Sequence, residues 1–153
     1  MRLILVIILC IYDLNISAQS KSNLKIANKY ANSKQCDKAN EIYKTLETKV
    51  NILSYYSNYL KCLIADRQYN TALALVKKVK KKYPNQAKYI ADLGFIYKAK
   101  GDKIRAEKEW NKSIDAIESG RINQVNSLAN SFSRNKEYNY LLKTYERGQA
   151  VNP

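Results

Sequence analysis

The sequence predicts an all-α protein, an α-solenoid of about four stacked antiparallel helical hairpins. Three observations predict this fold: apolar residues recur at spacings of three and four, large and small residues repeat with a period near 34, and turn-forming residues are scarce. Only four Gly and two Pro are present, which leaves little material for the tight turns of a β-rich fold. The 153 residues suit a single repeat domain.

The first 18 residues have the pattern of a signal peptide. Arg2 precedes an unbroken apolar run over residues 3–12, and the tripeptide Ile-Ser-Ala ends at residue 18. As a helix, the apolar run would span about 15 Å, half of the hydrocarbon core of a bilayer. We therefore expect cleavage after residue 18 and an exported repeat domain of residues 19–153, in the periplasm or at the cell surface, with no integral membrane span.

Four positions mark the repeat. The first position is held by mostly small residues at intervals of 33, 34 and 35: Ala27, Leu60, Gly94 and Ala129. Larger residues follow three positions later: Tyr30, Leu63, Tyr97 and Phe132. A second small position lies 12 residues after the first, and a second large one 16 residues after it: Ala39, Ala72, Ala106 and Leu141; Tyr43, Val76, Trp110 and Tyr145. Antiparallel helices approach closely where a small side chain meets a large one. The predicted units are residues 20–52, 53–86, 87–120 and 122–153.

Short polar segments separate the two helices of each unit: Ser33–Cys36, Asp66–Gln68, Lys100–Asp102 and Arg134–Lys136. In the third unit we expect Gly101 to end one helix and Asp102 to cap the next.

These residues resemble the tetratricopeptide repeat family, most clearly in the third unit. Leu93-Gly94, Tyr97, Gly101, Ala106 and Trp110 there fall at the spacing expected of the family. The resemblance covers residues 20–153 and implies an array in which the first helix of each hairpin lines a concave groove. The groove side chains that it implies are Asn28, Asn32, Lys61, Ile64, Phe95, Lys98, Asn130 and Arg134.

The charge of the chain points to an acidic partner. The sequence holds 27 basic and 13 acidic residues, a net charge of +14, which attracts anions. With these groove residues, the resemblance implies a basic, amide-rich groove that pairs with acidic side chains, with Phe95 as an apolar anchor. A lysine run over residues 77–82 is interpreted as the solvated side of an amphipathic helix whose Val76 and Val79 face the core, with an anionic docking surface as the alternative. No nucleic-acid recognition motif is present, and no nucleic acid is expected.

The cysteines and the absence of histidine restrict the chemistry. After loss of Cys10, Cys36 and Cys62 would remain, and we interpret them as small buried side chains, with a disulfide as the alternative. With no His in the chain, a zinc site and the usual catalytic triads are disfavoured, and the Gly residues form no phosphate-binding loop. A carboxylate could still act as a catalytic acid, and Glu107, Glu109 and Glu118 are the candidates. Their spacing, however, is that of surface ion pairs. We expect no enzyme activity, metal or cofactor.

The predicted function is therefore a protein–protein interaction scaffold of the cell envelope that binds a peptide or protein segment. The alternatives are a spacer or targeting domain of a larger assembly and, ranked lower, a cell-wall polymer-binding or lytic module. We also expect the last hairpin to expose an apolar face near Leu142 and Tyr145, which further repeats or self-association would cover.

Overall fold

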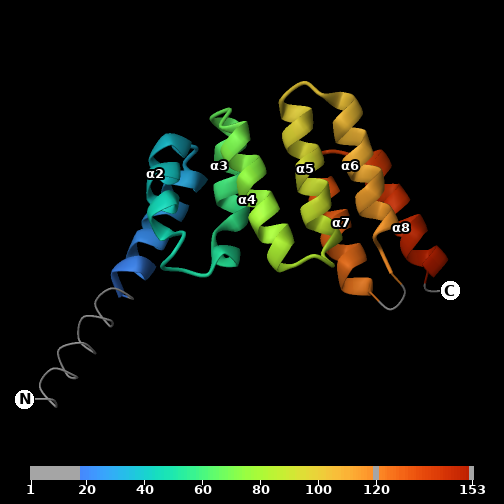
Figure 1. Cartoon of the computed structure of the whole chain (residues 1–153), viewed down its shortest axis with the longest axis horizontal. Coiled ribbons are helices and arrows are strands. Elements are labelled where there is room, and N and C mark those ends of the chain that lie inside the picture. The colour runs from blue at the N-terminus through green and yellow to red at the C-terminus, as the bar shows by residue number, and fades with distance from the viewer. Residues whose placement is uncertain (1–17, 119–120, 152–153) are drawn as a thin grey trace, which may run out of the picture. The chain divides into compact units, whose positions relative to one another are not determined.

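Helices account for the regular secondary structure of residues 18–118 and 121–151, the residues that the computed structural model of this chain describes. No strand occurs among them, so the all-α fold class is confirmed. The predicted signal peptide lies outside the described residues apart from its last residue. The chain divides into two compact units, Met1–Asp66 and Arg67–Pro153, and each is described by itself. Figure 1 labels the helices from α2 to α8.

The described helices coincide with the helical segments that the sequence predicts. The first unit holds a helix over residues 18–32 and then α2 (Cys36–Leu46), the short 3-10 helix η1 (Ile52–Ser54) and α3 (Tyr56–Ala65). The second unit holds α4 (Tyr69–Lys82), α5 (Ala87–Ala99), α6 (Lys103–Asp115), α7 (Ile122–Arg134) and α8 (Tyr138–Val151). Within it, α5 packs against α4, α6 and α7, and α8 packs against α6 and α7. The predicted unit 53–86 thus contributes α3 to the first compact unit and α4 to the second.

Four turns between helices repeat the same backbone conformation. Each contains one residue with positive φ, at the same intervals as the small residues in the sequence: Lys34 (φ 60°), Arg67 (58°), Gly101 (84°) and Lys136 (59°). This conformation ends an α-helix because it lets the next amide bond back to the last turn. In three turns that bond reaches the carbonyl of the large repeat residue: Gln35 to Tyr30, Asp102 to Tyr97 and Glu137 to Phe132, all at 2.9 Å.

The core of the second unit is built around Trp110, which is 3% exposed. Its ring lies 5.4 Å from that of Phe95 and 6.2 Å from that of Phe132, between centroids. Gly94 makes room for the indole, since a Cβ at this position would overlap Nε1 and Cδ1 of Trp110. The predicted pairing of a small with a large residue is confirmed here.

In the fourth hairpin the second helix does not repeat the burial pattern of α6. Tyr145, which the repeat aligns with Trp110, is 45% exposed, and Thr144 and Gly148 are buried instead. The reason is close packing of α8 on α7, where a Cβ on Gly148 would lie 2.9 Å from Cγ1 of Val125. Leu142 is 58% exposed, so α8 presents the apolar face expected near Leu142 and Tyr145.

The first unit is held together by a disulfide and by stacked tyrosines. Cys36 at the start of α2 is bonded to Cys62 in α3, with their Cα atoms 4.8 Å apart. The preferred interpretation of two free, buried thiols is therefore wrong, because the two helices bring the buried sulfurs together. Tyr43 stacks on Tyr55 at 5.5 Å between ring centroids. Burial raises the pKa of both hydroxyls to about 12, and so both rings stay neutral.

Asp102 caps α6 as predicted, and its charge makes the cap pH-dependent. Its Oδ1 accepts the amide of Arg105 at 2.9 Å, and this bond, followed by the ion pair with the Arg105 guanidinium, lowers the pKa of the Asp102 carboxyl. A lowered folded-state pKa contributes stability above the unfolded value of about 3.9, and that contribution is lost as the pH falls through the folded value.

We therefore expect Asp102→Ala to lower the free energy of unfolding at neutral pH, with a difference from wild type that shrinks as the pH falls well below about 4. Urea unfolding of both proteins, at neutral pH and at a pH well below about 4, measures this difference in the free energy of unfolding. Asp102→Asn, which keeps an acceptor without the charge, is the control and should lose the pH dependence while retaining most of the cap. A deficit of Asp102→Ala that is equal at both pH values would contradict this account.

Candidate functional site

In the first unit, the four predicted groove residues divide into one structural residue and three accessible ones. Oδ1 of Asn28 accepts hydrogen bonds from the Tyr43 hydroxyl at 2.7 Å and from Nδ2 of Asn58 at 2.9 Å. Asn28 therefore joins the two helices of its hairpin to α3. Asn32 and Lys61 are exposed, and Ile64 is half-buried.

In the second unit, two of the predicted residues have partners within the protein. Phe95 is 7% exposed and packs in the core, so it is not an exposed apolar anchor. Lys98, at the end of α5, forms an ion pair with Glu137, the residue just before α8. Asn130 and Arg134 are exposed on α7.

Asn130 and Arg134 belong to a longer row of exposed polar residues along α7, which we call the α7 stripe. Asn123, Asn126, Asn130 and Arg134 are exposed and follow one another at intervals of three and four, which places them on one side of the helix. The opposite side carries the buried residues Val125, Leu128 and Phe132. Asn123 and Asn126 were missed at the level of sequence, although the same spacing signals them.

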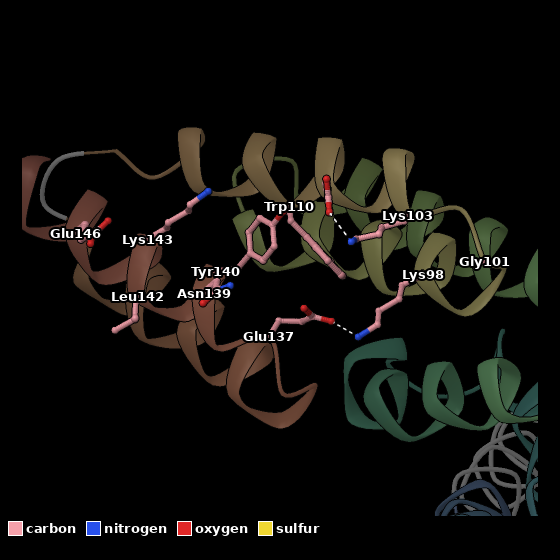
Figure 2. A pocket seen from close by; sticks show the side chains of 11 residues that line it. Lys98, Gly101, Lys103, Trp110, Glu137, Asn139, Tyr140, Leu142, Lys143 and Glu146 are labelled. Carbon is pink, nitrogen blue, oxygen red and sulfur yellow. Dashed lines mark hydrogen bonds and ion pairs between the residues drawn. The ribbon is translucent and has the colours of Figure 1, made fainter.

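A cavity of about 730 Å³ lies between α6, α8 and the end of α5 (Figure 2). Its lining mixes lysines, glutamates and aromatic rings: Lys98, Gly101, Lys103, Glu107, Trp110, Glu137, Asn139, Tyr140, Leu142, Lys143 and Glu146. Apart from Lys98, none of these was predicted as a site residue. The pairing of Lys98 with Glu137 joins residues 39 positions apart, which no local pattern signals.

The charges of this cavity largely compensate one another. Nζ of Lys103 lies 3.8 Å from Oε1 of Glu107. Lys98 faces Glu137, as Figure 2 shows. Burial, and then the charges of Glu107 and Glu137, raise the pKa of the Tyr140 hydroxyl, which keeps it a neutral hydrogen-bonding group. The ring of Tyr140 lies 4.9 Å from that of Trp110, between centroids.

Among the described residues, no group of three or more Cys, Asp or Glu side chains is placed to hold a metal ion. No helix of residues 18–118 and 121–151 is both long and apolar enough to cross a bilayer. A comparison with models of protein families found no match, and a comparison with curated proteins also found none.

Proposed function

We propose that this chain is a non-catalytic interaction scaffold, an array of tetratricopeptide-like hairpins that holds an acidic peptide or protein segment on the exposed faces of its first helices. The observation that carries the proposal is that Lys61, Asn130 and Arg134 project from such helices without a hydrogen bond or ion pair to any described residue. These groups are available to a ligand.

The repeated turn supports the array. Positive φ at Lys34, Arg67, Gly101 and Lys136 recurs at the repeat spacing, although three of these residues are not glycine. An L-residue in this conformation costs about 1 kcal/mol, so its recurrence indicates that the hairpin geometry imposes it.

The exposed groups suit an extended acidic segment. Amide side chains such as Asn130 can donate to and accept from a peptide backbone, which has one donor and one acceptor at most residues. Arg134, at the end of α7, can bind a carboxylate through two parallel hydrogen bonds. In the first unit, Lys61 offers a positive charge of its own. In this proposal backbone contacts give affinity, and the cation of each unit selects for acidic residues.

We further propose that the chain acts outside the cytoplasm, in the periplasm or at the cell surface. The signal-peptide pattern of residues 1–18 supports this location. The disulfide between Cys36 and Cys62 is also a feature of oxidising compartments.

Charge reversal tests the binding faces. Peptides selected by the wild-type chain from a displayed library should be rich in Asp and Glu. Lys61→Glu combined with Arg134→Glu should weaken binding of the tightest peptide. The expected loss, measured by calorimetry, is roughly 1–3 kcal/mol for each desolvated pair of a cation with a peptide carboxylate.

The matched control is Lys80→Glu combined with Lys81→Glu, which changes the net charge by the same amount outside the first helices. We expect it to leave peptide affinity nearly unchanged and helical content intact. Equal losses from both variants would mean that diffuse charge carries the binding. A library that yields no binder would favour a spacer or targeting domain.

A further inference from the structure

The strongest charge concentration in the molecule lies away from the first helices, on α4. Between Asp66 and Asp92 the chain has no acidic residue but seven basic ones: Arg67, Lys77, Lys78, Lys80, Lys81, Lys82 and Lys88. Five of these are the lysines in the second half of α4, which we call the α4 lysine array. Asp92 is paired with Lys88 at 3.0 Å, so it already has a cation of its own.

The array covers the outer side of the second half of the helix. Ala72, Leu75, Val76 and Val79 form the buried side of α4. At 100° per residue, the five lysines occupy the remaining directions, and all of them except the half-buried Lys80 are exposed. Lys77, Lys80, Lys81 and Lys82 form no ion pair with any described residue.

Fold stability does not explain this arrangement. The helix dipole favours cations in the last turn, which accounts for Lys80, Lys81 and Lys82 but not for Lys77 and Lys78. Like charges four residues apart on a helix repel one another, as do Lys77 with Lys81. A bound anion would relieve this repulsion.

We propose that the α4 lysine array docks the protein on the surface of a membrane that contains anionic phospholipids. The lysines lie on the side of the helix opposite its buried residues, and their flexible stems let several ammonium groups reach a flat layer of phosphates together. Tyr83 follows the array, half-buried, with its ring centroid 5.5 Å from Nζ of Lys82. Tyrosine beside lysine suits the boundary between headgroups and acyl chains.

Charge complementarity alone would also allow nucleic acid, but the aromatic residues of α4 do not favour it. Binding of single strands requires exposed rings on which bases stack. The one aromatic residue within α4 is Tyr69, and its hydroxyl donates to the carbonyl of Ala99 at 2.9 Å. Lysine ammonium groups also lack the planar fork with which arginine reads phosphates and bases.

Vesicle sedimentation tests the proposal with the whole chain. The probes are vesicles of phosphatidylcholine alone and vesicles of equal parts phosphatidylcholine and phosphatidylglycerol. We expect binding only to the second kind, weakened by salt. A lysine at an anionic surface contributes roughly five-fold in partitioning, so Lys77→Gln combined with Lys81→Gln should reduce binding about 25-fold.

The matched control is Lys108→Gln combined with Lys112→Gln on α6. This pair has the same spacing and charge change, both lysines are exposed, and Glu107 and Glu109 stand beside them. We expect less than about two-fold loss from it, because their charge is locally compensated. Equal losses from the two variants, equal binding to both kinds of vesicle, or binding of duplex DNA without binding of anionic vesicles would each overturn the proposal. The proposed binding of peptides uses other residues, so neither result decides the other.

Discussion

Replacing Trp110 with alanine is expected to lower the free energy of unfolding of the second unit by about 3–5 kcal/mol. The side chain is almost fully buried, and its ring contacts those of Phe95, Phe132 and Tyr140. Removing it leaves a cavity at the point where α5, α6, α7 and α8 meet. Urea unfolding followed by far-UV circular dichroism measures the loss. A loss below about 1 kcal/mol would show that this packing is not formed.

A double-mutant cycle with Gly94 locates the effect. In the wild-type background Gly94→Ala should cost about 1–3 kcal/mol, because the added Cβ overlaps the indole. In a Trp110→Leu background the same change should cost much less, since the smaller side chain leaves room. Trp110 is the only tryptophan, so the fluorescence of Gly94→Ala reports on the surroundings of this one ring. Additive costs would contradict the predicted contact.

Loss of the disulfide is expected to destabilise the first unit by about 3 kcal/mol. The bond between Cys36 and Cys62 closes a loop with a sequence separation of 26, and its removal lets the unfolded chain expand. Hydrogen exchange of the amides of α2 and α3 in Cys36→Ser combined with Cys62→Ser measures the loss within this unit.

Reduction of the wild-type chain provides the control for that substitution. A reducing agent should accelerate exchange in α2 and α3 of the wild type to the level of the double variant, and it should not affect the variant itself. Exchange in α7 and α8 should stay unchanged, because these helices lie in the other compact unit. Wild type and double variant with equal protection would contradict a stabilising role of the bond.

The sequence predicted the helices and their turns because these depend on local patterns. The polar segments at residues 33–36, 66–68, 100–102 and 134–136 coincide with the observed turns to within about a residue. The lysines of α4 and the buried Val76 and Val79 also follow the predicted faces. Both features depend on neighbours within one helical turn or one hairpin.

Features that depend on distant residues were not predictable in the same way. The burial pattern of α8 was missed because Thr144 and Gly148 fit against Val125, a match of shapes that periodicity does not express. The disulfide was left as an alternative because sequence does not give the distance between two cysteines. Phe95 was placed in the groove by the resemblance to tetratricopeptide repeats, whereas it is buried in the aromatic core of the second unit.

The central claim is that the first helices carry the binding face. The most direct measurement is the change in backbone amide chemical shifts when a library-selected acidic peptide is added to the isotope-labelled chain. The account predicts that the largest changes fall at Asn32 and Lys61 in the first unit and along the α7 stripe, Asn123, Asn126, Asn130 and Arg134. Largest changes at the α4 lysine array, or around the cavity between α6 and α8, would contradict it.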